Sequence, residues 1–386
     1  MSPSPVRPDY QGGSIVNLMA AVSEGLGGGA TGYPPLAELP PERLAERPVV
    51  LFVLDGLGEA LLQRFPDSHL ARHRARRLTS VFPSTTATAI TSFATAVGPQ
   101  QHAVTGWFTY FRELGSLAAV LPFRPRHGGG SYTDSGLQPA DLIPAGPFYE
   151  RLSVPARVLN PAYIADTAYS AFSTRGATTR GYDGLEAFFA EAARATREGP
   201  GYTLAYWPEL DRTAHQFGIG SREVEAHFRE LDAAFGAFLE AAAGSGALVL
   251  ATADHGLIDS DPLHHIDLAD HPRLAGMLTL PLAGDPRLAV CYVRAGREAD
   301  FLAYLRDNLD HACTPVESAE LIEEGWFGLG PASPRLAERA GDYALLMKSN
   351  YVIYDRLPGD GPFPLTGVHG GVSGEEMTVP LVVAEP

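Results

Sequence analysis

Aspartate and histidine residues recur at the points where apolar runs of the sequence end. Asp55 follows the run 49–54, Asp211 and His215 follow the run 202–207, and Asp254 and His255 follow the run 247–253. The runs are rich in β-branched and aliphatic residues, which is typical of strands buried on both faces. Open α/β sheets place functional residues beyond the carboxyl ends of such strands. The three strand ends are therefore candidate positions for chemistry.

The residue types at these positions are those of a metal site. A fourth turn supplies His369, which is followed by glycines that let the backbone approach a ligand closely. Asp211 and His215 are four residues apart, so in a helix both side chains point from one face. Aspartate and histidine without cysteine suit Zn²⁺, and also Mn²⁺ in a more oxygen-rich site. Six such ligands and one hydroxyl can form a two-metal site for in-line phosphoryl displacement.

The candidate hydroxyl lies in the segment 82–88, Phe-Pro-Ser-Thr-Thr-Ala-Thr. Small residues without proline continue to residue 95 and predict a helix whose first turn carries several hydroxyls. A helix N-terminus favours bound anions. Alternatively, Ser84 or Thr85 is only an N-cap, an isolated Asp-Gly is only a turn, and the Asp211–His215 pair is only a solvated helix face. Their joint occurrence at strand ends favours the chemical interpretation.

Composition limits the classes of partner. The 386 residues carry a formal charge of −16, which argues against extended tracking of nucleic-acid phosphates. A small phosphate ester remains compatible, because bound metal ions can invert the local field. No apolar run approaches the roughly 20 residues that cross a bilayer, and the N-terminus lacks a secretory pattern, so we expect no membrane partner and a cytoplasmic protein.

Cys291 and Cys313 are expected to be two buried thiols rather than a disulfide.

The alternation of buried strands with helices predicts an α/β fold with a largely parallel central sheet and helices on both faces. Helices are expected over 15–23, 185–198 and 224–243, and further core strands over 154–159 and 378–384. Residues 107–150 are rich in glycine, proline and aromatics and are expected to form a long loop or flap. From residue 278 the pattern changes to a strand over 287–293, a helix over 299–309 and one or two strands over 343–354. We predict a small inserted α+β subdomain over 278–350, with the catalytic core formed by 1–277 and 351–386.

The motifs together resemble those of a known group of enzymes. Asp55-Gly56, Phe-Pro-Ser-x-Thr ending at Thr86, Asp211-x-x-x-His215, Asp254-His255-Gly256 and His369-Gly370 occur in the order used by the alkaline phosphatase superfamily. The chain is most similar to its type I phosphodiesterase/nucleotide pyrophosphatase family, which implies an alkaline-phosphatase-like core. The resemblance implies one zinc held by Asp55, Thr86, Asp254 and His255, and a second held by Asp211, His215 and His369. It also implies that Thr86 is the nucleophile and forms a phospho-threonine intermediate.

The sequence also departs from the family pattern. Ala87 replaces an aromatic residue that would stack on a nucleobase, Ala89 replaces a phosphate-binding asparagine, and Ala214 replaces a glycine. Nucleotide specificity therefore does not follow. Thr88 could supply the missing hydrogen bond. The sequence leaves the roles of several other residues open. A stacking platform or a place in the core is possible for Trp107, Phe108, Tyr163 and Trp207, and a contact to a distal phosphate or a surface charge for Arg175 and Arg180. His102 is a structural or supporting histidine, and His264 and His265 lie outside the core ligand set.

We predict a metal-dependent phosphoric diester hydrolase with two Zn²⁺ per chain, or Mn²⁺, that acts on a small-molecule phosphate ester. On the same scaffold, the alternatives are a hydrolase of phosphomonoesters, phosphonates or sulfate esters, and a Mn²⁺-dependent phosphomutase that the motif order disfavours. Outside the enzyme class, the alternative is a metal-binding protein without catalysis, which would have no need for the Thr86 hydroxyl. The sequence leaves the physiological substrate and the oligomeric state open.

Overall fold

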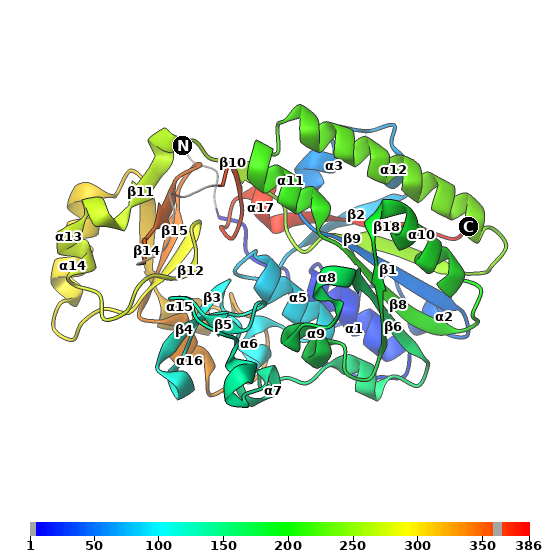
Figure 1. Cartoon of the computed structure of the whole chain (residues 1–386), viewed down its shortest axis with the longest axis horizontal. Helices are drawn as coiled ribbons and strands as arrows, with labels where there is room; N and C mark the ends of the chain where they lie inside the picture. Colours follow the sequence, from blue (N-terminus) through cyan, green and yellow to red (C-terminus); the bar gives the residue numbers. More distant parts are fainter. Residues whose placement is uncertain (1–4, 358–364) are drawn as a thin grey trace.

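The computed structural model describes residues 5–357 and 365–386, and its larger sheet has seven strands (Figure 1). Their spatial order is β2 (Arg74–Thr79), β18 (Thr378–Ala384), β9 (Leu248–Thr252), β1 (Pro48–Leu54), β8 (Gly201–Trp207), β6 (Ala156–Pro161) and β7 (Thr178–Tyr182). The five strands from β9 to β7 are parallel to one another. Only β18 runs antiparallel to its neighbours β9 and β2. The largely parallel sheet predicted from the sequence is thus confirmed.

Helices cover both faces of this sheet because its central strands are apolar on both sides. All seven residues of β1 are buried, and β8 and β9 are buried almost throughout. Helices α10 (Gly184–Ala195) and α12 (Arg222–Ala242) lie on one face, and α1 (Ile15–Gly25) and α5 (Thr86–Thr95) lie on the other (Figure 1). On the first face, the Phe52 ring contacts four phenylalanine rings of α10 and α12. The helices predicted over 15–23, 185–198 and 224–243 are therefore present with shifted ends.

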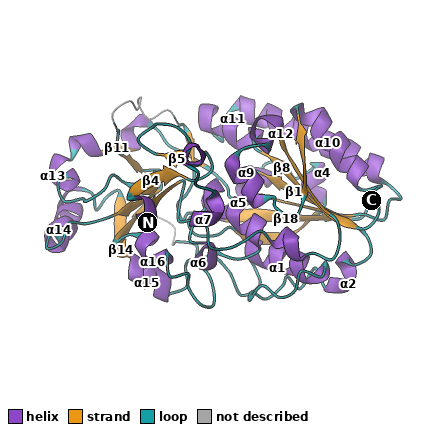
Figure 2. Cartoon of the chain, turned by 60° about the horizontal axis from the view of Figure 1, so that its bottom comes forward, coloured by secondary structure: helices purple, strands orange, loops and turns teal. Residues whose placement is uncertain are grey.

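A second seven-stranded sheet is entirely antiparallel and lies beside the first (Figure 2). Its order is β14 (Cys313–Glu317), β15 (Tyr343–Met347), β13 (Leu288–Cys291), β12 (Ala283–Asp285), β3 (Phe108–Phe111), β4 (Ser116–Ala119) and β5 (Arg124–Pro125). The expectation of a long loop over 107–150 was wrong, because β3, β4 and β5 extend the sheet. Strands of two to four residues are too short to produce a readable alternation. The boundary of an inserted subdomain at 278–350 stays a prediction, since the second sheet also uses strands from the earlier segment.

Shorter elements complete the described chain. The remaining helices are α2 (Pro41–Leu44), α3 (Glu59–Leu62), α4 (His69–Arg72), α6 (Pro99–His102), α7 (Pro139–Leu142), α8 (Ala162–Ala165), α9 (Ala168–Ser173), α11 (Glu209–Phe217), α13 (Pro272–Ala275), α14 (Glu298–Asn308), α15 (Ser318–Glu323), α16 (Leu336–Ala340) and α17 (Gly374–Met377). The remaining strands are β10 (Ile258–Asp259), β11 (His265–Asp267), β16 (Val352–Tyr354) and β17 (Gly367–Val368). Every helix of the described residues is too short or too polar to cross a bilayer. Cys291 and Cys313 are both buried free thiols, as predicted.

A buried ion pair joins the second sheet to the chain beyond His369. The Arg287 guanidinium donates to both carboxylate oxygens of Glu376, at 3.0 and 2.9 Å, and also to the Tyr351 carbonyl. Glu376 in turn accepts a hydrogen bond from the Gly371 backbone at 2.9 Å. The two side chains are 1% and 0% exposed. This pair therefore fixes the turn that carries His369 against the second sheet.

We expect Glu376→Gln to lower the free energy of unfolding by about 3–5 kcal/mol, because it leaves the Arg287 charge buried without a counter-charge. Chemical denaturation measures this loss. Glu385→Gln is the matched control, since Glu385 forms surface pairs with Arg43 and Arg47 and should contribute less than about 1 kcal/mol. Equal losses in the two variants would contradict the structural role of the buried pair.

Candidate functional site

The carboxyl ends of three adjacent parallel strands bring the predicted ligands together. Asp55 directly follows β1, and Asp254 and His255 follow its neighbour β9. On the other side of β1, strand β8 leads into α11, which carries Asp211 and His215. His369 enters from the turn after β17 and is nine-tenths buried. The structure thus brings together the strand ends at which the sequence places these aspartates and histidines.

Interatomic distances define one continuous cluster. His255 Nε2 lies 3.3 Å from Asp254 Oδ2 and 3.5 Å from Asp55 Oδ1. Asp211 lies 3.1 Å from His215 Nε2 through one carboxylate oxygen and 3.8 Å from His369 Nε2 through the other. The His255 and His369 rings stack with centroids 3.7 Å apart. All six predicted aspartates and histidines therefore surround one small volume.

Thr86 is the hydroxyl that faces this cluster. It is the first residue of α5, and its Oγ1 lies 3.1 Å from His255 Nε2. The neighbouring hydroxyls have other partners, since Ser84 donates to the Gly371 carbonyl and Thr85 donates to Asp285 Oδ1 at 2.8 Å. Thr88 is fully buried and does not line the cavity described below, so the structure gives it no contact with that space.

Backbone contacts orient two of the histidines. His215 Nδ1 lies 2.7 Å from the Gly367 carbonyl, and His255 Nδ1 lies 3.1 Å from the Gly256 carbonyl. A carbonyl only accepts, so each Nδ1 carries a proton and donates it, and in the neutral ring each Nε2 then keeps its lone pair. Such outer contacts fix the tautomer of metal-binding histidines. Both Nε2 atoms are thus ready to act as ligands.

Asp55 and Asp254 each have one oxygen held by hydrogen bonds and one oxygen without a hydrogen-bond partner, and Asp211 also has one oxygen without a partner. Asp254 Oδ1 accepts from the Gly56 and His255 backbone N–H groups, at 3.1 and 3.0 Å, and Asp55 Oδ2 accepts from the Tyr206 hydroxyl. Within the described chain, the buried atoms without a hydrogen bond include Asp55 Oδ1, Asp211 Oδ1 and Asp254 Oδ2. Such orphaned oxygens are costly unless a cation or donor satisfies them. Their convergence fits bound metal ions.

The pKa shifts of the cluster also fit bound metal ions. Burial, together with the neighbouring Asp254 and Asp211, raises the pKa of Asp55 well above its usual range. Burial, together with the adjacent His255, lowers the pKa of His369 well below its usual range. The cluster therefore holds one carboxyl group, that of Asp55, which resists ionisation beside an imidazole that stays neutral. Added positive charge would stabilise the ionised carboxylates, and a neutral imidazole is the form that binds metals.

The donor atoms form two overlapping groups of metal-ligand type, in each of which the atoms lie within 4.8 Å of one another. One group holds Asp55, Asp254 and His255, and the other holds Asp211, His255 and His369. Both overlap with the predicted division of ligands between two ions, but His255 belongs to both. Which ion each residue binds, and whether the ions are zinc, stay predictions.

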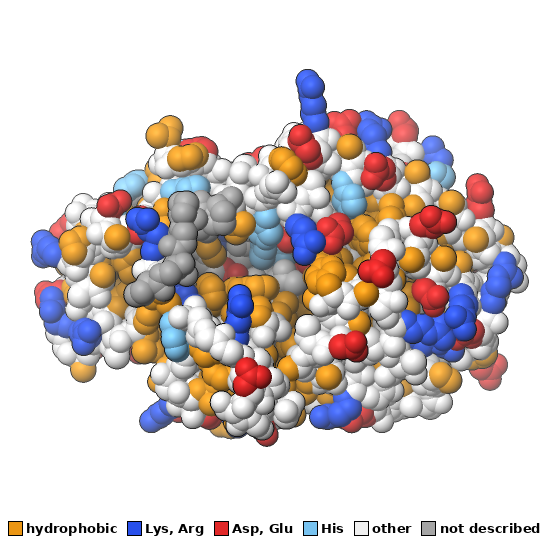
Figure 3. All heavy atoms as spheres, in the orientation of Figure 1, with side chains coloured by type: hydrophobic (Ala, Val, Ile, Leu, Met, Phe, Trp, Pro, Cys, Tyr) orange, Lys and Arg blue, Asp and Glu red, His pale blue; other side chains and the backbone are white. Residues whose placement is uncertain are grey.

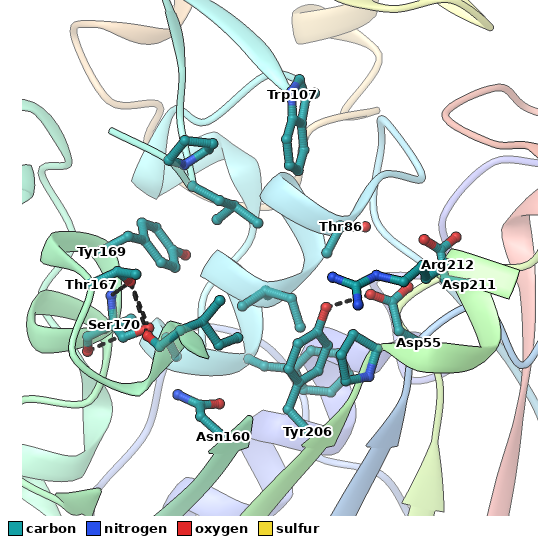
Figure 4. Close-up of a pocket in the computed structure, with 18 of the residues that line it drawn as sticks. Asp55, Thr86, Trp107, Asn160, Thr167, Tyr169, Ser170, Tyr206, Asp211 and Arg212 are labelled. Carbon is teal, nitrogen blue, oxygen red and sulfur yellow. Dashed lines mark hydrogen bonds between the residues drawn. The ribbon is translucent and has the colours of Figure 1, made fainter. Parts of the chain in front are cut away.

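A cavity of about 760 Å³ opens beside the cluster (Figure 4). Asp55, Thr86 and Asp211 lie at one end, whereas Tyr169 and Ser170 lie at the opposite end. The outer surface is hollowed between the parts of the molecule that contain the two seven-stranded sheets. Histidine side chains lie in this hollow next to hydrophobic ones (Figure 3). The cluster is therefore accessible to a small molecule.

The secondary candidates separate into three groups. Trp107, Phe108 and Tyr163 line the cavity, whereas Trp207 is a buried core residue whose ring stacks on His227. Surface ion pairs engage the two arginines, Arg175 with Glu150 and Arg180 with Glu191 and Glu198, as expected for surface charges. The buried histidine His102 is structural, because its ring nitrogens lie near Ser92 Oγ and the Val104 N–H, and burial lowers its pKa to about 3. His264 and His265 do not belong to either metal-ligand group, and His264 pairs with Asp261.

Two residues of the site were not predicted. Tyr206 donates to Asp55, and its only signal in the sequence is a hydroxyl within a buried strand. Asp285, in β12, accepts from Thr85 Oγ1 and from the Trp107 N–H at 3.1 Å. Burial raises its pKa to about 6 despite these hydrogen bonds. A single aspartate in a separate sheet carries no local signal, because only the tertiary fold brings it to the nucleophile turn.

Comparison with solved structures identifies the class of fold. Murine ectonucleotide pyrophosphatase/phosphodiesterase 5 is 16% identical, with a TM-score of 0.65 and 88% of each chain covered. An inactive Thr-to-Ala variant of the murine protein in complex with AMP is also 16% identical, with a TM-score of 0.63 and 87% of each chain covered. Phosphonoacetate hydrolase from Sinorhizobium meliloti 1021, in complex with phosphonoformate, is 18% identical, with a TM-score of 0.64, and the match covers 88% of this chain and 90% of that one. The fold is therefore the alkaline-phosphatase-like fold of these proteins.

The family model for type I phosphodiesterase/nucleotide pyrophosphatase matches residues 49–371. This segment includes every candidate ligand of the cluster, from Asp55 to His369. The chain belongs to that family, as the sequence motifs indicated. None of the curated proteins compared with the chain matches it significantly.

We expect Asp254→Asn and His369→Ala each to lower the bound metal by about one equivalent per chain, because each removes a donor from a different group. Elemental analysis after dialysis measures the content. His264→Ala is the control and should keep the wild-type content, since His264 lies outside both groups. Unchanged content in both test variants would contradict the metal assignment, and loss of all metal from either would contradict two separable sites.

Proposed function

We propose that this protein hydrolyses phosphoric diesters with two divalent cations, preferentially Zn²⁺, and through a phospho-threonine at Thr86. The observation that carries the proposal is the convergence of three unpartnered carboxylate oxygens with histidine nitrogens, one of which, His255 Nε2, lies 3.1 Å from Thr86 Oγ1. Asp55, Asp254 and His255 would hold one ion beside Thr86, and Asp211, His215 and His369 would hold the other. Two bound cations would favour the alkoxide form of Thr86 and stabilise charge on the attacking and leaving oxygens.

The first turn of α5 offers backbone N–H groups to a phosphate group. Thr85 is the N-cap residue, but its side chain does not cap the helix, because its hydroxyl donates to Asp285 instead. The first-turn N–H groups of a helix have no partner within the helix. They are therefore available to hold the non-bridging oxygens of a phosphoryl group bonded to Thr86.

The reaction balances as two displacements. In the first, Thr86 Oγ1 loses its proton to solvent and bonds to phosphorus, while the bond between phosphorus and the leaving alcohol breaks and that oxygen takes up a proton. In the second, water attacks phosphorus and the bond to Thr86 Oγ1 breaks, which restores the hydroxyl. The products are a phosphomonoester and an alcohol.

Charge around the cavity favours a diester over a monoester. A diester carries one negative charge at neutral pH, whereas a monoester carries about two. Among the described residues that line the cavity, Arg212 is the only lysine or arginine, and it pairs with Glu209. The site therefore offers no dedicated side-chain cation for the extra charge of a monoester.

The comparisons agree with a threonine nucleophile. The AMP complex of the murine relative was obtained with an inactive variant in which a threonine is replaced by alanine. In this chain, Thr86 is the threonine whose hydroxyl faces the ligand cluster. AMP also has the chemistry of a product that a nucleotide diester would release, which supports diester hydrolysis within the family.

We expect Thr86→Ala to lower the hydrolysis of bis(4-nitrophenyl) phosphate by about a thousandfold or more, because no hydroxyl remains to form the intermediate. Metal content should stay at the wild-type level, since the six charged or imidazole ligands remain. Thr86→Ser keeps a hydroxyl and should retain measurable turnover.

Wild-type protein should also hydrolyse bis(4-nitrophenyl) phosphate in preference to 4-nitrophenyl phosphate. Nearly full activity in Thr86→Ala would place the nucleophile elsewhere. Preference for the monoester, or for a phosphonate or sulfate ester, would contradict the diester assignment while keeping the site.

A further inference from the structure

The cavity continues beyond the metal cluster along helix α5. Thr86, Ile90 and Phe93 are at positions i, i+4 and i+7 of this helix, and all three line the cavity. Because an α-helix rises about 1.5 Å per residue, the cavity follows α5 for about 10 Å from Thr86. A space of this length and volume is typical of a small-molecule site.

Charge is confined to the metal end of the cavity. The aspartate, histidine and arginine side chains that line it are Asp55, Asp211, Arg212, His215, Asp285 and His369. These residues belong to the cluster, lie on α11 beside it, or bond to the turn before Thr86. Farther along α5 the walls include Ile90, Phe93, Val158 and Leu204, and no described lining residue there is charged. Burial of an unpaired charge is costly, so this part of the cavity suits an uncharged group.

Most hydroxyl groups at the end of the cavity away from the metal cluster, here called the deep end, already have hydrogen-bond partners within the protein. Ser173 Oγ and Thr174 Oγ1 donate to the Ser170 carbonyl at 3.3 and 2.8 Å. Tyr169 shares a 2.7 Å hydrogen bond with Thr91 Oγ1. A ligand with many hydroxyls, such as a sugar ring, would find few free partners here. The deep end therefore suits an apolar group better than a polar one.

The side-chain amide of Asn160, unlike these hydroxyl groups, has no hydrogen-bond partner within the described protein. The residue lies near the end of β6 and is 7% exposed. Figure 4 shows its amide directed into the cavity between Tyr206 and Ser170. Because this amide faces the cavity without a protein partner, a ligand group that donates or accepts one or two hydrogen bonds would pair with it.

We propose that this cavity binds one alcohol portion of the diester, namely a predominantly apolar group that carries one hydrogen-bonding group near Asn160. The proposal rests on the proposed function, because the cavity joins the ester site at Thr86. It assigns substrate selectivity to the face of α5 beyond Thr86 and to Asn160. It also separates this substrate class from nucleosides, whose sugar and base need several polar partners.

A series of alkyl 4-nitrophenyl phosphates tests the proposal on the wild-type protein. The methyl, butyl and octyl esters share the 4-nitrophenolate leaving group, so differences in kcat/KM report the retained group. We expect kcat/KM to rise by up to about fourfold per buried methylene until the cavity is full. The octyl ester should also exceed thymidine 5′-(4-nitrophenyl phosphate).

The outcomes separate the two proposals. Hydrolysis of the methyl ester without a gain for longer chains, or a preference for the thymidine ester, would overturn the apolar site alone. Absence of hydrolysis for every diester would overturn the proposed function and the substrate class with it.

Two substitutions locate the site. Ala94 lines the cavity on α5, so Ala94→Leu fills part of the space and should lower the octyl-to-methyl ratio of kcat/KM by about tenfold or more. Ala241→Leu, on the exposed side of α12, is the matched control and should leave the ratio unchanged. Asn160→Leu should lower the ratio of the 6-hydroxyhexyl to the hexyl ester by about fivefold. Unchanged ratios in both cavity variants would overturn the assignment of these residues.

Discussion

Burial of the Asp55 carboxyl group beside Asp254 and Asp211 is the constraint to which the structure responds. Burial and the two neighbouring carboxylates oppose the ionisation of Asp55, and no arginine or lysine joins the described hydrogen bonds of the three side chains. The parallel strands β1, β8 and β9 still bring them together, because the apolar core beneath them fixes the strand ends. N–H and hydroxyl donors hold one oxygen of Asp55 and Asp254 and leave the other free. Stability of the core thus keeps Asp55 in an arrangement that bound cations would stabilise.

The second sheet contributes to the same site through hydrogen bonds. Asp285 of β12 accepts from Thr85 and thereby keeps the N-cap hydroxyl away from the first turn of α5. Arg287, two residues later, pairs with Glu376, which holds the backbone after His369. One short segment of this sheet therefore fixes both the nucleophile turn and the turn that carries a candidate ligand. Its role in the site is to position these turns, in addition to forming a wall of the cavity.

The sequence revealed those parts of the structure that depend on local patterns. Apolar runs such as 49–54 predicted the core strands, and the order of the Asp and His motifs predicted which side chains converge. Strands β3 and β4 escaped prediction because four residues give too little alternation and their stability comes from pairing with β12 and with each other. Asp285 and Tyr206 escaped for a related reason, since their importance depends on contacts between distant segments. The shared position of His255 between two ligand groups is likewise a property of distances alone.

The departures from the family pattern acquire a physical meaning in this context. Ala87 is fully buried and packs with Val104 and Phe111 in a hydrophobic cluster, so its side chain does not offer a platform at the cavity. Ala89 is equally buried in the main core. Contacts that would select a nucleotide are thus absent at both positions. The side chains that do face the cavity from α5 come one and two turns later, at Ile90, Phe93 and Ala94. Selectivity in this chain is therefore determined farther along the helix, where apolar packing dominates over stacking and phosphate contacts.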